Sequence, residues 1–480
     1  MNGIDLSKPL NVHFIGIGGI SMSGLAEILI GRGFRVSGSD RAESPLTKHL
    51  TELGADIRYP QAAENIGDRD IDLVVYTAAI HPDNPEYVAC SDRGLHMVTR
   101  AALLGAIMDG YSQSVAVAGT HGKTTTTSMV TQILLEDGVH RPTVSVGAVD
   151  PAIGSNVLVG NDDAFVAEAC EYSNSFLSLH PTIAVVLNVE AEHLDFFKNL
   201  VAIRQSFHDF ITNIKPGGCV VINAGIENYT ELTADTAARD VRVVTFGKDE
   251  GVDCYPTEIS YNAMGCGSFV PVYKGKKLSR VELKVPGGHN ILNACAAIAA
   301  AIALNENEQA EAADGAAGTF AIREDAIAAG LSKFTGAKRR FEYRGTFQGA
   351  TVVDDYAHHP TEIEATLRAA ERVAHKRLIL VFQPHTYTRT KAFLSDFARV
   401  LEIPDIVVLA PIYAAREKDV YGIHSTDIRD LLVKAGRNAY AFDTFSEIEA
   451  FLQKNCVNGD LLITMGAGDV VKIADDLTAE

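Results

Sequence analysis

The sequence has no tryptophan, few cysteines and no long apolar run. Its seven cysteines are scattered over 480 residues and form no Cys-x-x-Cys pair, which is typical of reduced thiols in a cytosolic protein. No stretch approaches the roughly 18 uninterrupted apolar residues of a membrane-spanning helix. Residues 1–10 lack the basic stretch and apolar run of a secretion signal. The sequence therefore predicts a cytoplasmic protein without membrane insertion.

Basic residues are scarce relative to acidic ones. Lysine and arginine number 42 against 61 aspartates and glutamates, which gives a formal net charge of −19. This charge opposes binding to nucleic acid and to anionic membranes. An anionic substrate would therefore need local basic residues or magnesium.

Length and pattern predict three α/β domains. A chain of 480 residues exceeds one hydrophobic core, and about three domains are expected at roughly 100 to 200 residues each. Strand-like apolar runs pass through glycine or polar residues into helical patterns, as in parallel α/β folds. We place a Rossmann-like domain at 1–110, a P-loop ATPase-like domain with a mainly parallel sheet and a β-rich segment at 111–333, and a second Rossmann-like domain at 334–480. Residues 305–318 lack an apolar period and are predicted to be an exposed insertion.

A glycine-rich segment in the second domain is the strongest single motif. It follows the strand-like run 114–118 and opens a helical pattern, so its backbone N–H groups can hold phosphate oxygens. Lys123 can reach a transferred phosphate, and Thr124 can coordinate magnesium. The usual loop has a further glycine where this chain has Val117, and the alternative is a glycine turn capped by threonines. The candidate ATP-binding residues of this loop are Gly119, Thr120, His121, Gly122, Lys123, Thr124 and Thr125.

Polar residues follow two further strand-like runs of this domain. Glu168 and Glu171 come after the run 164–167, and His193 follows the run 183–187. Parallel neighbours would present these side chains at the same sheet edge as the phosphate loop. Carboxylate and imidazole there can hold magnesium that bridges to ATP. His193 alone would equally suit a hydrogen-bonded loop histidine.

The first domain opens with a second glycine turn after the strand-like run 11–15. A diphosphate at the following helix N-terminus, with an aspartate nearby, fits a nucleotide-sugar as well as it fits NAD. Ser21 stands where a dinucleotide fingerprint has its third glycine, and the alternative is a tight strand-to-helix turn. The candidate residues are Gly16, Gly18, Gly19, Ser21 and Asp40.

Two polar loops follow consecutive strand-like runs of the third domain. The first loop includes Asp355 and His358, and the second includes Arg389. Both should lie at the carboxyl edge of a parallel sheet, where ligands bind in open α/β folds. Either loop alone could be a helix cap, since Thr361 and Thr388 precede helical patterns.

Taken together and in order, these segments resemble the Mur ligases over nearly the whole chain. No single segment is specific, but the set is. Within the family, the chain is most similar to the enzymes that join L-alanine to UDP-N-acetylmuramate. The segments that carry the resemblance are residues 13–19, 118–127, 168–171, 188–195, 288–293, 338–342, 354–362, 383–391 and 465–469.

The resemblance implies that the three domains bind the UDP-sugar, ATP and the incoming amino acid in that order and close over them, in a monomer or homodimer. The sugar carboxylate would attack the γ-phosphate of ATP, and the L-alanine amine would then attack the acyl phosphate, in peptidoglycan precursor synthesis. His358 is the candidate for accepting a proton from the amine or orienting it. Family motifs assign His289, Asn290, Asn293, Arg340 and Asp355 to the ATP site, and Arg389 with His358 to the amino-acid site.

Two departures from the family pattern affect these assignments. The segment that usually reads Glu-Ala-Asp-Glu-Ser-Asp keeps both glutamates but lacks both aspartates, so Glu171 carries more of the magnesium site, with Thr124 and His193. Thr386 stands where many relatives have arginine, which leaves Arg389, with Lys391 as a further candidate, to hold the amino-acid carboxylate.

Three alternatives stay open from the sequence. One is a murein-peptide ligase that adds a tripeptide to the same sugar nucleotide. Another is an NAD-dependent oxidoreductase that uses the first-domain glycines, which leaves Lys123 unexplained. The last is a non-catalytic UDP-sugar sensor, which has no need of Lys123, Glu171 and His193 together.

Overall fold

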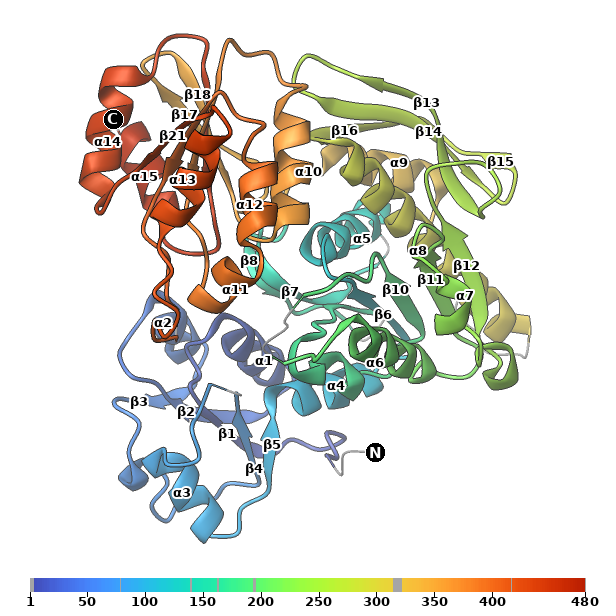
Figure 1. The fold of residues 1–480 in the computed structure, drawn as a ribbon. Helices are drawn as coiled ribbons and strands as arrows, with labels where there is room; N and C mark the ends of the chain where they lie inside the picture. The colour runs from blue at the N-terminus through green and yellow to red at the C-terminus, as the bar shows by residue number, and fades with distance from the viewer. Residues whose placement is uncertain are drawn as a thin grey trace. The chain divides into compact units, whose positions relative to one another are not determined.

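The computed structural model describes residues 4–77, 79–138, 140–161, 164–192, 196–313, 322–415 and 417–479. The chain is α/β throughout and forms three sheets (Figure 1). It divides into two compact units. The first unit contains 1–257, 270–279 and 292–333, and the second contains 258–269, 280–291 and 334–480. The domain boundaries predicted at 110 and 333 stay a prediction.

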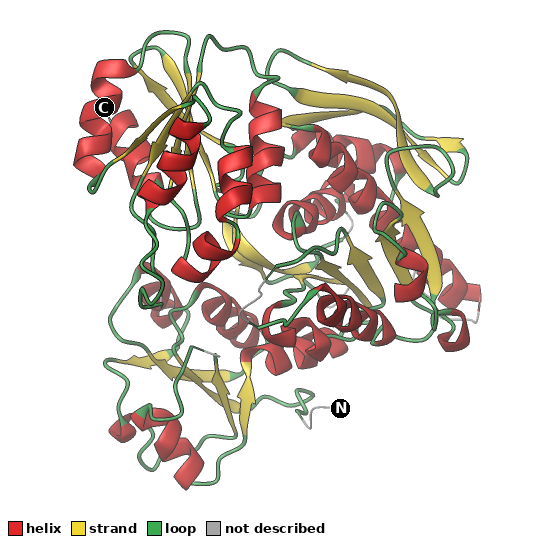
Figure 2. Ribbon diagram, in the orientation of Figure 1, coloured by secondary structure: helices red, strands yellow, loops and turns green. Residues whose placement is uncertain are grey.

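The first sheet has five parallel strands in the order β3-β2-β1-β4-β5. Helices cover both of its faces (Figure 2), so the central strands β1 and β4 are mostly buried. Because all five strands are parallel, their carboxyl ends lie at one edge. The strands are β1 (Asn11–Ile15), β2 (Arg35–Ser39), β3 (Asp56–Arg58), β4 (Leu73–Tyr76) and β5 (Met97–Thr99), and the helices are α1 (Ile20–Gly31), α2 (Pro45–Glu52), α3 (Pro85–Asp92) and α4 (Arg100–Asp109).

The second sheet has 11 strands, and its centre is parallel with the order β12-β11-β10-β6-β9-β7. Its strands are β6 (Gln113–Ala118), β7 (Thr143–Asp150), β8 (Ser155–Leu158), β9 (Ala164–Glu168), β10 (Ile183–Val186), β11 (Cys219–Asn223), β12 (Arg242–Phe246), β13 (Cys254–Tyr261), β14 (Cys266–Tyr273), β15 (Lys276–Lys277) and β16 (Val281–Pro286). Its helices are α5 (Lys123–Asp137), η2 (Tyr172–Ser178), α6 (Leu200–Thr212), α7 (Tyr229–Leu232), α8 (Gly288–Ala313) and α9 (Glu324–Lys333). The phosphate loop follows β6, between the ends of β9 and β10.

Two helices of the first sheet pack against the central part of the first unit. The side-chain amide of Asn156, in β8, donates to the backbone oxygen of Ile20 in α1 over 2.9 Å. Gly105 in α4 comes so close to η2 that an added Cβ would lie 1.9 Å from the backbone oxygen of Ser178. The absence of a side chain at Gly105 thus allows α4 to lie close to η2.

The interpretation of 305–318 as an exposed insertion is wrong for its first part. Helix α8 continues to Ala313, and Glu306 forms ion pairs with Arg242 and Lys274, the latter at 3.0 Å. The side chain of Asn305 bonds the backbone of Ile322. These tertiary contacts hold a helical turn that has no apolar period of its own. Residues 314–318 lie outside the described part.

The third sheet belongs to the second unit and has the order β17-β18-β22-β19-β20-β21. Only its edge strand β17 is antiparallel. Its strands are β17 (Glu342–Phe347), β18 (Ala350–Asp355), β19 (Leu378–Phe382), β20 (Ile406–Leu409), β21 (Asn438–Ala441) and β22 (Leu461–Met465). Its helices are α10 (Pro360–Ala370), α11 (Tyr387–Ala392), α12 (Leu394–Val400), α13 (Ser425–Lys434), α14 (Phe445–Asn455) and α15 (Val471–Thr478).

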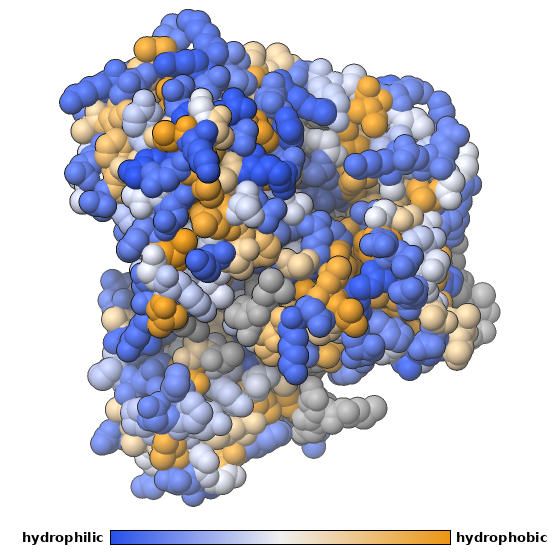
Figure 3. Space-filling model, viewed as in Figure 1, coloured by the Kyte–Doolittle hydropathy of each residue, from blue (hydrophilic) through white to orange (hydrophobic). Residues whose placement is uncertain are grey.

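One stretch of the described chain is long and apolar enough to cross a membrane. It is residues 288–307 of α8, and 72% of its most apolar 18-residue window is buried inside the protein, as in a core helix. The face drawn in Figure 3 is mainly hydrophilic, with apolar side chains in small groups.

Candidate active site

The phosphate loop has the predicted strand-loop-helix geometry. Strand β6 ends at Ala118 and α5 begins at Lys123, and the φ angles of Gly119 and Gly122 are +147° and +82°. A Cβ on Gly119 would lie 2.9 Å from the Cβ of Leu187, so glycine is required there. The loop therefore turns tightly onto the N-terminus of a 15-residue helix, whose N–H groups can hold an anion.

Lys123 is held by the loop and by one buried carboxylate. Its Nζ donates to the backbone oxygens of Gly119 and Thr120 over 2.5 and 3.0 Å and forms an ion pair of 3.0 Å with Glu171. Burial works against the charged lysine, but the carboxylate of Glu171 outweighs it, and the net pKa of Lys123 is raised. The side chain thus carries a full positive charge where a phosphate would lie.

Glu168 is the carboxylate that contacts the loop hydroxyl. The Oγ1 of Thr124 and the backbone N–H of Gly147 each donate to Glu168 Oε2 over 2.9 Å. Hydroxyl and carboxylate oxygens are the hard ligands that magnesium prefers, so the side chains of Thr124, Glu168 and Glu171 are of the chemical type that suits a magnesium ion. The third ligand predicted from the sequence, His193, lies outside the described residues.

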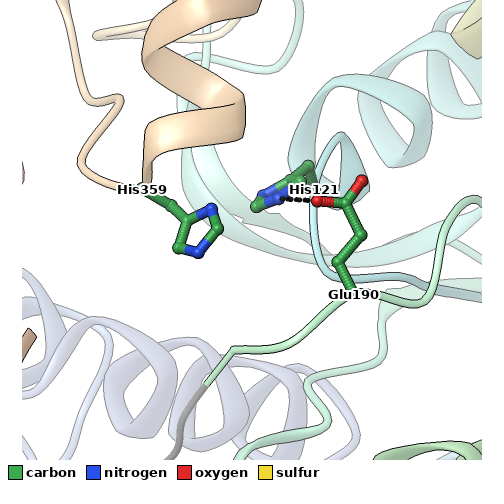
Figure 4. A group of neighbouring side chains, drawn as sticks. All are labelled: His121, Glu190 and His359. Carbon is green, nitrogen blue, oxygen red and sulfur yellow. Dashed lines mark ion pairs between the residues drawn. The ribbon is translucent and has the colours of Figure 1, made fainter. Parts of the chain in front are cut away.

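The segment after β10 braces the loop. The side chain of Asn188 accepts from the N–H of His121 over 2.7 Å and donates to its oxygen over 3.0 Å. The N–H of Glu190 donates to the Thr120 hydroxyl over 2.9 Å, and its carboxylate faces the His121 ring at 3.4 Å (Figure 4). These contacts fix both the backbone and the imidazole of the phosphate loop.

The glycine turn of the first domain is closed by Asp40. The N–H groups of Gly16 and Ile17 donate to the Ser39 oxygen over 2.9 Å, and the N–H of Gly18 donates to Asp40 Oδ2 over 2.7 Å. Asp40 thus lies against the turn, next to the predicted diphosphate position at Gly19 and Ser21. A diphosphate there would compete with the Asp40 carboxylate for the Gly18 N–H.

The two polar loops of the second unit meet at the carboxyl edge of the third sheet. The ring of His358 lies 5.7 Å from that of His385, and Nδ1 of His385 lies 3.1 Å from the guanidinium of Arg389. His358 Nδ1 is 3.2 Å from Glu362, and Tyr413 stacks on His385. His358 and Arg389, predicted for the amino-acid site, are therefore brought together.

Asp355 and Arg340 lie on the same side of this sheet edge. Asp355 accepts from the N–H of Phe341 over 2.7 Å and from that of Ala357 over 2.8 Å. Arg340 stands over the ring of Tyr356. Burial raises the pKa of the Asp355 carboxyl to about 6, although Arg340 and the two N–H groups favour its charged form.

Asp355 should make the stability of the protein depend on pH. Because its folded pKa lies above the ordinary value, its contribution is complete below about pH 4 and is lost as pH rises through about 6, by up to about 3 kcal/mol. Asp355→Asn should remove this dependence. Urea unfolding below pH 4 and above pH 6 would measure this pH dependence of the free energy of unfolding. The control is Asp430→Asn, whose carboxyl is 65% exposed. Equal pH dependence in Asp355→Asn and wild type would contradict the assignment.

The residues assigned to the adenine side lie around the start of α8. Burial lowers the pKa of His289 to about 4, so its ring is neutral near pH 7. The amide of Asn290 donates to the Pro286 oxygen over 2.8 Å. The Oδ1 of Asn293 would be 2.8 Å from a Cβ on Gly122, so Asn293 touches the phosphate loop.

Comparison with known proteins matches each part of the chain to a Mur ligase model. The Mur ligase family catalytic domain matches residues 11–112, the Mur ligase middle domain 117–301, and the Mur ligase glutamate ligase domain 339–468. A UDP-N-acetylmuramate–L-alanine ligase of Agathobacter rectalis is 54% identical over 99% of both chains. The chain belongs to the Mur ligase family. The chain is also 50% identical to the UDP-N-acetylmuramate–L-alanine ligase of Lachnospira eligens, over 99% of this chain and 100% of the relative.

Solved structures give the same fold for this Mur ligase. The UDP-N-acetylmuramate-alanine ligase of Thermotoga maritima matches with a TM-score of 0.76 and 29% identity over 98% of both chains. A murein peptide ligase of Psychrobacter arcticus matches with a TM-score of 0.67 and 24% identity over 98% of both chains, which shows the fold alone.

Several residues of this Mur ligase site were not assigned from the sequence. Asn188 and Glu190 brace the phosphate loop, and His385 lies beside His358 and stacks on Tyr413. Their common signal is position after a strand: Asn188 and Glu190 follow β10, which pairs with β6, His385 follows β19, as Arg389 does, and Tyr413 follows β20, which pairs with β19. Strand order, which the sequence does not show, selects them.

Proposed function

We propose that this Mur ligase joins L-alanine to UDP-N-acetylmuramate, with cleavage of ATP to ADP and phosphate, in peptidoglycan precursor synthesis. The observation that carries the proposal is the phosphate loop, where Lys123 and Thr124 face the carboxylates of Glu171 and Glu168. Full-length relatives that bear the name of this reaction support the choice of substrates.

In the first step the sugar carboxylate attacks the γ-phosphate of ATP and forms an acyl phosphate. The loop N–H groups and Lys123 hold and neutralise the phosphates, which aligns two anions that would otherwise repel each other. Asn188 and Glu190 keep the loop in this shape. Thr124, Glu168 and Glu171, with His193 as a further candidate, would hold magnesium, which supplies additional positive charge at the phosphates.

In the second step the amine of L-alanine attacks the acyl carbon, and phosphate leaves. The amine must be neutral to react, so a base has to take its proton. His358, whose Nδ1 faces the Glu362 carboxylate at 3.2 Å, is our candidate for this base or for orienting the amine. Arg389 is our candidate for the amino-acid carboxylate, because a guanidinium can bind it in a bidentate manner.

The acceptor is tested by release of phosphate. Purified protein with ATP, magnesium and UDP-N-acetylmuramate should release phosphate with L-alanine at least about a hundredfold faster than with the tripeptide, because a site shaped for a small amino acid leaves a longer acceptor poorly placed. Activity with the tripeptide alone would favour the murein-peptide ligase. Turnover of a nicotinamide would revive the oxidoreductase, and absence of any turnover would favour the sensor.

We further propose a cytoplasmic protein that acts as a monomer or homodimer on small molecules. The net charge of −19 supports small-molecule substrates, since it opposes nucleic acid and anionic membranes.

A further inference from the structure

Arg100 is a half-buried arginine that forms no hydrogen bond or ion pair with any residue that the structure describes. It is the first residue of α4 and directly follows β5. An arginine at such a depth is normally paired, because desolvation of an unpaired charge is unfavourable. The position therefore suits the binding of an anion.

Arg100 lies between the first sheet and the segment that follows β9 beside the phosphate loop. Arg100 lies at the carboxyl edge of the first sheet, as does the Gly16 turn. Its helix packs on η2 through Gly105, five residues or about 7.5 Å further along the axis. The segment 168–171 directly precedes η2, and two of its residues, Glu168 and Cys170, act electrostatically on Arg100 at the start of α4. Burial lowers the pKa of the Arg100 guanidinium, while the nearby Cys170 and the Glu168 carboxylate act in the opposite direction.

We infer that Arg100 binds the carboxylate of the UDP-sugar that accepts the γ-phosphate; this inference rests on the proposed function. Glu168, whose charge acts on Arg100, accepts the hydrogen bond of the Thr124 hydroxyl, so an anion at Arg100 would lie on the side of the transferred phosphate. The diphosphate belongs to the Gly16 turn, two strands away or about 10 Å along the sheet edge.

The chemistry of the first step requires such a residue. The sugar carboxylate has to approach ATP in a place that already contains the carboxylates of Glu168 and Glu171. Lys123 is paired with Glu171 and is assigned to the phosphates in the proposed mechanism, so the sugar carboxylate needs a further positive charge. The planar guanidinium of Arg100 can bind this carboxylate through two parallel hydrogen bonds and orient its free oxygen lone pair toward the γ-phosphate.

Two sugar nucleotides test the inference by isothermal titration calorimetry. UDP-N-acetylmuramate carries the lactyl carboxylate, and UDP-N-acetylglucosamine lacks it. Arg100→Ala should raise the Kd of the first about 10- to 100-fold and that of the second by less than about twofold. Arg100→Lys should regain part of the affinity but little of kcat, since an ammonium does not orient a carboxylate.

The matched control is Arg35→Ala. Arg35 is exposed and begins β2, at the amino ends of the strands of the first sheet, so its replacement should change neither Kd. Equal weakening of both nucleotides by Arg100→Ala would mean contact with the diphosphate or support of the fold, and would overturn the inference, as would no change in either. These measurements need no acceptor amino acid. A wild-type protein that binds UDP-N-acetylmuramate but does not use L-alanine would therefore contradict the proposed function. The Kd values of the Arg100 variants would still test the role of Arg100.

Discussion

Replacing Lys123 by alanine is expected to lower ADP formation about a thousandfold or more, while UDP-N-acetylmuramate still binds. The reason is that Lys123 Nζ lies within 3.0 Å of the backbone oxygens of Gly119 and Thr120 and of Glu171. At this position its positive charge can stabilise the γ-phosphate during transfer. The proposed site of the sugar nucleotide is at the first sheet, which the substitution does not touch. ADP release and calorimetric binding of UDP-N-acetylmuramate measure the two effects separately.

Loss of folding has to be separated from loss of chemistry in this experiment. Lys123→Ala leaves the carboxylate of Glu171, which is 2% exposed, without its counter-ion, and such a charge destabilises a protein by about 3 to 5 kcal/mol. The double variant Lys123→Ala with Glu171→Gln removes that charge and should regain stability but not activity. Lys333→Ala, on the exposed end of α9, is the control and should behave as wild type. Normal turnover in the single variant would refute the proposed role of Lys123.

The phosphate loop could be predicted from the sequence because its information is local. The loop needs glycines with positive φ at Gly119 and Gly122, and it needs Lys123 and Thr124 at the start of a helix. Val117 stands where the usual loop has a glycine, but this difference does not alter the prediction of the loop. Val117 is a buried strand residue whose partner in β9 is Glu168.

The remaining site residues depend on strand order and packing. Glu168 and Asn188 flank the loop only because β9 and β10 pair on either side of β6. Arg100 follows a strand of three residues, and nothing in its local sequence distinguishes it from a surface arginine. The helical turn at 305–307 is stabilised by Arg242 and Lys274, which are far away in the sequence. A pattern of apolar residues cannot show such contacts.

Gly105→Ala is expected to give the largest loss of stability from a single methyl group. The added Cβ would lie 1.9 Å from the backbone oxygen of Ser178 and 2.9 Å from its carbon. Neither group is the end of a flexible side chain, so α4 has to move away from η2 by more than an ångström. We expect a loss of about 3 kcal/mol, the upper part of the range for overpacked cores.

The control for Gly105→Ala lies on the same helix. Gly110, at the end of α4, has a φ of −76°, and an added Cβ would meet its nearest atom at 3.4 Å, so Gly110→Ala should be neutral or slightly stabilising. Urea unfolding of the two variants measures the difference. Since α4 begins with Arg100, displacement of the helix should also weaken binding of UDP-N-acetylmuramate in Gly105→Ala and leave it unchanged in Gly110→Ala. A Gly105→Ala protein as stable as wild type would show that α4 does not rest on η2 as closely as described, and the position of Arg100 beside Glu168 would then lose its support.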